Sequence, residues 1–95
     1  MTIPISKIAE IHKVDGRDIA ESVRAIHTKF DAGRVEIVLD FTSVLRIDPA
    51  GLREMEDLAT ISEETREKIC LLHVNVEIYK VLKLSGLSGR FNFRT

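Results

Sequence analysis

The sequence predicts an α/β fold with a small, mostly parallel β-sheet, because apolar strands alternate with amphipathic helices along the chain. Two apolar runs, VEIVLDF at residues 35–41 and ICLLHV at residues 69–74, are too short for helices and too apolar for exposed strands. Around them, apolar residues recur at intervals of three and four, the period of a helix. Strands in this order pair in parallel through right-handed crossovers, with helices on one face of the sheet or on both.

The first strand and the first helix are predicted within residues 3–30. Apolar residues alternate over residues 3–11, with one interruption at Lys7, which predicts a strand with one wet face near a sheet edge. A helical stripe then follows the capping candidates Asp15 and Asp18 and ends before Gly33. The alternating residues are Ile3, Ile5, Ala9 and Ile11, and the stripe consists of Ile19, Val23, Ile26 and Phe30.

Residues 35–95 complete the predicted fold. The run at 35–41 is predicted as a central parallel strand, and a helix is expected from the segment IDPAGL to about Thr65. Residues 69–74 predict a second buried strand, Asn75 can cap a last helix, and Gly86 can end it. The tail can add a short closing strand. With no linker or repeat, the sequence predicts one domain, residues 1–95.

The segment IDPAGL, residues 47–52, has the composition of a helix start. Asp48 is a preferred N-cap residue, and Pro49 falls at the first helical position, where its fixed φ and missing N–H are harmless. Capping does not explain Gly51, since glycine in a helix costs up to about 1 kcal/mol relative to alanine. We therefore expect another backbone or a partner to approach closely at Gly51.

Composition excludes several classes of function. The chain has 95 residues, 14 basic against 15 acidic, and a formal net charge of -1, so no overall field recruits nucleic acid or an anionic membrane. A single cysteine, Cys70, excludes an intrachain disulfide and a cysteine-cluster metal site, and it is predicted as a core thiol. Neither a signal peptide nor a membrane-spanning run is recognisable, so a cytoplasmic protein is expected.

The segment VEIVLDFTSVLRIDPAGL resembles the central signature of the STAS domain, found in bacterial anti-sigma-factor antagonists and in the tails of anion transporters. In that family an apolar strand ends in Asp, a Ser/Thr-containing loop follows, and Asp-Ser-Ser-Gly-Leu begins a helix. The later segment ICLLHVNVEIYKVLKLSGLSGRF resembles the closing strand, turn and last helix of the family, so the likeness covers residues 35–93. The positions that match the first signature are Asp40, Thr42, Val44, Ile47, Asp48, Gly51 and Leu52.

The sequence departs from the family pattern in two places. The family usually begins with two strands before its first helix, whereas only residues 1–14 precede the predicted helix here, so one strand is missing or very short. The serine that is phosphorylated in switchable antagonists is replaced by Pro49, and Ala50 also lacks a hydroxyl. The resemblance therefore implies a domain that serine phosphorylation does not switch at this motif. Thr42 and Ser43 are interpreted as turn formers rather than regulatory sites.

Charge separates along the second half of the chain. Residues 51–67 hold six acids against two arginines, whereas residues 80–95 hold four basic residues and no acid. A solvated helix face and a soluble tail would explain this pattern. The functional alternative is a partner that meets the start and outer face of the predicted helix, drawn by its acidic side, as the resemblance implies. The predicted partner-binding residues are Asp48, Pro49, Ala50, Gly51, Arg53, Glu54, Glu56 and Asp57.

Three functions are compatible with these observations. The first is a non-catalytic STAS-like interaction domain that binds a regulatory protein, such as an anti-sigma factor or a related kinase, without a cofactor or metal. The second is a cytoplasmic STAS subunit of a membrane transport complex, for ABC-type lipid trafficking or anion transport. The third is an aspartate-based phosphohydrolase.

The sequence disfavours the phosphohydrolase. Asp40 and Asp48 would follow strand ends, where α/β sheets bind ligands, but the segment between them offers only Arg46 as a cation. The three histidines are predicted near a strand end, on a helix and in an apolar strand, with no nucleophile at a suggestive spacing. They are His12, His27 and His73. No glycine-rich phosphate loop is present in the sequence.

Overall fold

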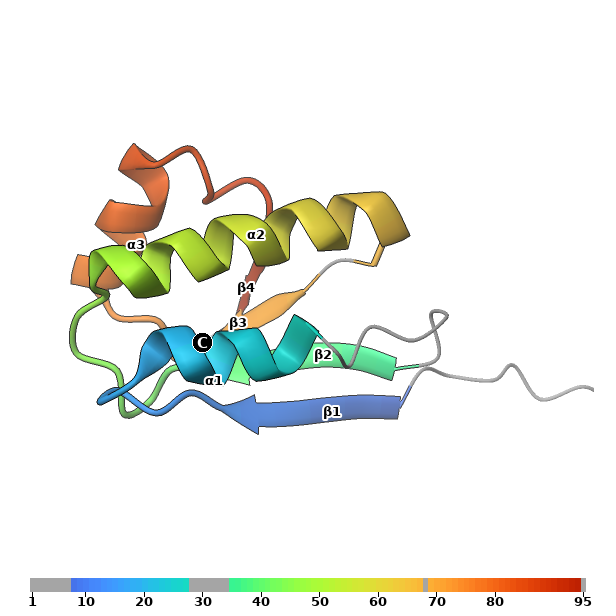
Figure 1. Cartoon of the computed structure of the whole chain (residues 1–95), viewed down its shortest axis with the longest axis horizontal. Coiled ribbons are helices and arrows are strands. Elements are labelled where there is room, and N and C mark those ends of the chain that lie inside the picture. The colour runs from blue at the N-terminus through green and yellow to red at the C-terminus, as the bar shows by residue number, and fades with distance from the viewer. Residues whose placement is uncertain (1–7, 28–34, 68, 95) are drawn as a thin grey trace, which may run out of the picture.

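The computed structural model describes residues 8–27, 35–67 and 69–94. These residues form one four-stranded sheet in which every pair of neighbouring strands is parallel and the spatial order is β1-β2-β3-β4 (Figure 1). The strands are β1 (Ile8–Lys13), β2 (Val35–Asp40), β3 (Cys70–Leu72) and β4 (Asn92–Arg94). The predicted parallel α/β fold is confirmed, with β1 at an edge and β2 inside the sheet, as expected.

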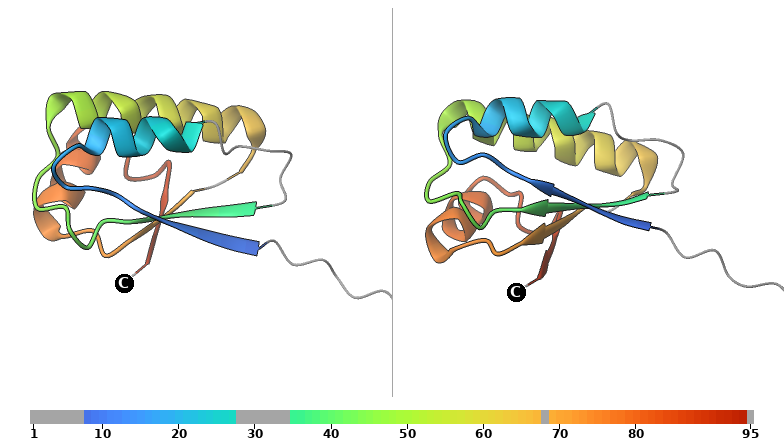
Figure 2. Two further views of the ribbon diagram at one scale, coloured as in Figure 1. Left: turned by 60° about the horizontal axis from the view of Figure 1, so that its bottom comes forward. Right: turned by 90° about the horizontal axis from the view of Figure 1, so that it is seen from below.

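In the described part of the chain, three helices connect the strands: α1 (Ile19–Ile26), α2 (Pro49–Thr65) and α3 (Val76–Leu84). Both views of Figure 2 show α1 and α2 together over one face of the sheet, with α3 beside the carboxyl ends of the strands. A sheet that grows in one direction through right-handed crossovers places successive helices on the same side. The structure thus answers a question that the sequence left open, because α1 and α2 share one face.

The hydrophobic core lies between the sheet and these helices. Alternate residues of β2, Ile37 and Leu39, face the helices, and Phe41 continues this layer just after the strand. The predicted helical stripes supply the other side of the core, for example Val23 of α1 and Met55 of α2, both fully buried. Burying side chains of this size stabilises the fold by roughly 1.5–3 kcal/mol each.

The opposite face of the sheet carries a smaller apolar layer. Val38 and Cys70 are paired in register and are 4% and 1% exposed, yet neither belongs to the main core. The pKa of the Cys70 thiol is raised, mainly by burial. The Arg94 charge lowers this pKa and the Glu36 charge raises it, both by less than burial does. Arg94 and Glu36 themselves form an ion pair at 3.4 Å. The cysteine is therefore buried as predicted, but on the face that α1 and α2 do not cover.

Side-chain caps fix the start of each helix. Asp18 Oδ1 accepts the Glu21 N–H at 3.1 Å, and Asn75 Oδ1 accepts the Ile78 N–H at 2.9 Å. Gly86, with a φ of 75°, follows the end of α3 in the left-handed conformation that glycine tolerates best. These predicted helix signals are confirmed.

One predicted strand is shorter than expected, and one of the capping candidates has another role. The strand predicted over residues 69–74 spans only Cys70–Leu72, because the chain turns at His73, where φ is 58°. The prediction that His73 lies in an apolar strand is wrong, and its side chain is exposed. Of the two capping candidates before the first helix, Asp18 is the N-cap of α1, whereas Asp15 orders the preceding turn by accepting the Arg17 N–H at 2.9 Å.

Some predictions fall outside the described residues. The first part of the expected N-terminal strand, residues 3–7, is among them. Phe30 at the end of the first helical stripe and the expected stop at Gly33 also lie outside the described ranges.

Candidate interaction surface

The start of α2 is built as the IDPAGL segment predicts. Asp48 is the N-cap, its Oδ1 accepts the Gly51 N–H at 2.8 Å, and Pro49 occupies the first helical position. A Cβ atom on Gly51 would lie 2.9 Å from Ile19 Cγ2 and 2.7 Å from Asp48 Oδ1. The close neighbour of Gly51 is therefore the Ile19 side chain of α1 in the same chain, rather than the backbone or partner that was expected. Gly51 is buried.

Three loops at the carboxyl edge of the sheet are tied together beside this helix start. Ser43 Oγ, in the loop after β2, donates a hydrogen bond to the Val14 carbonyl oxygen after β1 at 2.9 Å. The Asn75 side-chain amide, after β3, donates to the carbonyl oxygens of Val44 and Leu45, both at 3.2 Å. Because these bonds bridge the three strand-to-helix loops, the surface that the loops form is preorganised.

An exposed surface, which we call the α2 entry, surrounds the helix start. Leu45 is 77% exposed although its neighbour Val44 is buried and its backbone is held in place. The remaining members of the α2 entry, all exposed, are Arg46, Pro49, Ala50 and Arg53. Leu45 is not among the predicted site residues, because one apolar residue in a loop has no periodicity. The signal that was available is the pair Val44-Leu45, of which a short loop can bury only one side chain.

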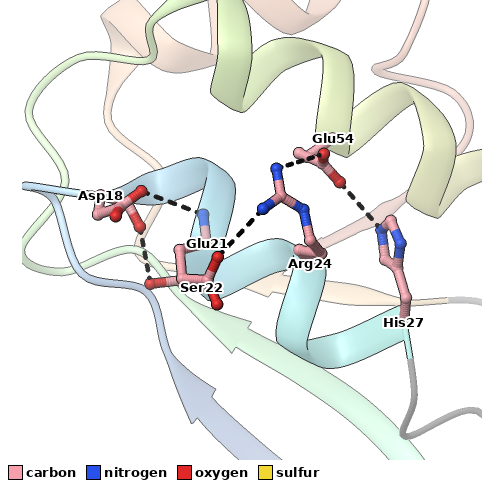
Figure 3. Close-up of polar contacts among 6 residues, drawn as sticks. All are labelled: Asp18, Glu21, Ser22, Arg24, His27 and Glu54. Carbon is pink, nitrogen blue, oxygen red and sulfur yellow. Dashed lines mark hydrogen bonds and ion pairs between the residues drawn. The ribbon is translucent and has the colours of Figure 1, made fainter.

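The predicted acidic face of α2 divides into two parts. Glu54 is only 14% exposed and accepts a hydrogen bond from Arg24 Nη2 of α1 at 3.2 Å, while His27 Nε2 lies 3.6 Å from its other carboxylate oxygen (Figure 3). Glu54 therefore holds α1 against α2. Glu56 and Asp57 are exposed, as a binding face requires.

The acidic helix and the basic tail also meet within the molecule. Arg90 Nε donates to the Glu63 carboxylate near the far end of α2, and this bond lowers the pKa of Glu63. Part of the acidic charge of α2 is therefore paired with a basic residue from the C-terminal segment of the same chain.

The two aspartates considered for catalysis are both engaged by neighbouring groups of the chain. Asp40 accepts hydrogen bonds from the backbone N–H and the hydroxyl of Thr42, and these bonds lower the pKa of the Asp40 carboxyl. Asp48 is the helix cap described above. Among the residues that the structure describes, no three or more His, Cys, Asp or Glu side chains are grouped so that they could hold a metal ion.

Comparison with known structures supports the topology. The chain is similar to the crystal structure of a protein from Thermotoga maritima assigned as an anti-sigma factor antagonist, with a TM-score of 0.71. The alignment covers 100% of this chain and 84% of the other, at 17% sequence identity. The chain has a STAS-like fold. No family model matches the sequence, and no curated protein does.

The STAS-like fold places the α2 entry at the end of the sheet where the strand-to-helix loops gather. At this level of identity the comparison concerns the fold alone. Within the described residues, none of the helices combines the length and the apolar composition needed to cross a bilayer.

Proposed function

We propose that this protein is a non-catalytic STAS-like interaction domain that binds a regulatory protein, such as an anti-sigma factor or a related kinase, through the α2 entry and the first turns of α2. The observation that carries this proposal is Leu45, a large apolar side chain left 77% exposed on a loop whose backbone is fixed by hydrogen bonds. A rigid apolar anchor with a polar rim is the usual centre of a protein interface. The structural neighbour, an assigned anti-sigma factor antagonist, supports the same class of partner.

The contacting set that we propose has two parts. Leu45, Pro49 and Ala50 supply apolar and small contacts, while Glu56 and Asp57 lie exposed further along the helix and would steer a basic partner. Glu54 contributes indirectly, since its bond to Arg24 fixes how α1 and α2 pack together.

The proposed domain binds constitutively, because residues 48–51 contain no hydroxyl group. A phosphate at this turn would add about -1.5 to -2 charges to an interface, which is how such a surface could be switched off. Pro49 removes that possibility while remaining well suited to the first helical position.

Affinity capture from an extract of the native organism tests the proposal with four baits. The wild type and Glu64→Lys, a charge reversal at the far end of the same helix, should both recover a sigma-regulating or kinase-like protein. Pro49→Glu and the double variant Glu56→Lys/Asp57→Lys should recover much less of it. All four should stay folded, because each changed side chain is exposed, and thermal melts check this.

Titration calorimetry and stopped-flow binding with the identified partner complete the test. We expect the Glu56→Lys/Asp57→Lys variant to bind roughly tenfold more slowly, with a weaker salt dependence. If Pro49→Glu and the double variant bind as well as the wild type, the interface does not lie on this surface. Recovery of an ATPase together with a permease would contradict the proposed regulator and support the transport complex instead.

A further inference from the structure

A cleft that shares Leu45 and Arg46 with the α2 entry, but includes no residue of α2 itself, lies between the loops that follow β1 and β2. It has a volume of about 740 Å³, within the range of sites that hold small molecules. Its lining residues are Lys13, Val14, Asp15, Gly16, Arg17, Ser43, Leu45 and Arg46. The carboxyl ends of parallel strands, where this cleft lies, are the usual position of ligand sites in α/β sheets.

The two walls of the cleft are locked together. The Ser43 hydroxyl, from the loop after β2, donates to the Val14 carbonyl oxygen in the loop after β1. Gly16 lies so close to the Ser43 carbonyl that a Cβ atom on residue 16 would clash with it. A side chain at residue 16 would therefore force the loops apart, and the glycine keeps the cleft in its present shape.

The charge of the cleft is predominantly positive. Lys13, Arg17 and Arg46 line it against one carboxylate, that of Asp15, which accepts from the Arg17 backbone and lies 3.5 Å from Arg17 Nε. The Asp40 carboxylate, which does not line the cleft, also attracts the Lys13 ammonium electrostatically. Within the described ranges neither Lys13 nor Arg46 forms an ion pair, and Asp40 attracts Lys13 only at longer range, so both side chains can contact a ligand.

The charge and the apolar rim of the cleft indicate which chemical groups a ligand would carry. The guanidinium fork of Arg46 matches the geometry of a phosphate group, and the ammonium of Lys13 adds a point charge from the other wall. Leu45 supplies an apolar surface on the same rim. We propose that the cleft binds the phosphate monoester of a small organic molecule, with the phosphate between Lys13 and Arg46 and the organic part against Leu45.

Titrations of the full chain followed by amide chemical shifts in NMR spectra test this proposal. The probes are adenosine monophosphate, inorganic phosphate and adenosine. Adenosine monophosphate should shift the amides of residues 13–17 and 43–46 in a saturable way and bind more tightly than inorganic phosphate. Adenosine, which lacks the phosphate, should leave these amides unchanged.

Two variants show whether the cleft is responsible. Lys13→Gln/Arg46→Gln should weaken binding of adenosine monophosphate by about tenfold or more, since charged hydrogen bonds are lost. Lys83→Gln, which neutralises an exposed lysine of α3 outside the cleft, should bind like the wild type. All these side chains are exposed, so the variants should fold, and their amide spectra verify it.

The proposal is overturned if adenosine monophosphate produces no saturable shifts in these segments. It also fails if the double variant and Lys83→Gln bind equally, or if inorganic phosphate binds as tightly as the ester. None of these results bears on the proposed protein partner, because the titrations contain no partner.

Discussion

Replacing Gly51 by alanine separates packing from helix propensity at the start of α2. In an exposed helix, alanine would gain up to about 1 kcal/mol over glycine. Here the new Cβ would meet Ile19 Cγ2 at 2.9 Å and the capping oxygen of Asp48 at 2.7 Å. Overpacking costs about 1–3 kcal/mol and displacing the cap adds about 0.5–2 kcal/mol; after the helix-propensity gain of about 1 kcal/mol, we expect a net loss of about 0.5–4 kcal/mol.

Urea denaturation followed by circular dichroism measures this loss, and the melting temperature should fall by about 4–8 °C per kcal/mol. The matched control is Ala50→Gly at the neighbouring exposed position, which should cost only the propensity difference, at most about 1 kcal/mol. In a double-mutant cycle, Ile19→Ala should reduce the cost of Gly51→Ala, since it removes the Cγ2 atom that would clash. A Gly51→Ala protein as stable as the wild type would refute the packing explanation.

Three further changes test local features of the structure. Asp48→Ala should lower the free energy of unfolding by about 0.5–2 kcal/mol, whereas Asp48→Asn should be nearly neutral in the same urea assay; equal large losses would exclude capping. Thr42→Val should raise the pKa of Asp40 toward its ordinary value in an NMR titration, because one of the bonds that lower it is lost. A depressed pKa stabilises the fold above the unfolded-state value and ceases to do so as the pH falls through the folded one, so wild type and variant should converge in stability on acidification. Arg90→Gln should likewise raise the pKa of Glu63, with little effect on stability because the pair is at the surface; an unchanged Glu63 titration would contradict the bond.

The parts of the fold that follow from local chemistry could be predicted from the sequence. Asp48 and Asn75 cap helices because their side chains reach N–H groups only three residues away, which is a property of the local chain. The buried strand β2 is similarly evident from its apolar run, since an interior parallel strand has no wet face.

Features that depend on tertiary contacts could not be predicted in this way. β3 ends before His73, where φ is positive, and a histidine at that position does not predict a positive φ. Glu54 belongs to the same acidic stretch as Glu56, and only the packing of α1 against α2 reveals that it faces Arg24. For the same reason, the sequence could indicate that Gly51 has a close neighbour but could not identify Ile19.

The sequential strand order has a consequence for how the chain can fold as it is synthesised. Each strand pairs with the one made just before it, so a newly formed β-strand adds to an edge that already exists. Among the four strands that the structure describes, none has to wait for a later one to fill a gap, as happens in sheets whose first strand lies in the middle. The contacts between strands therefore remain relatively local, which lowers the loop-closure cost of each step. The sheet can assemble strand by strand in the order in which the ribosome delivers it.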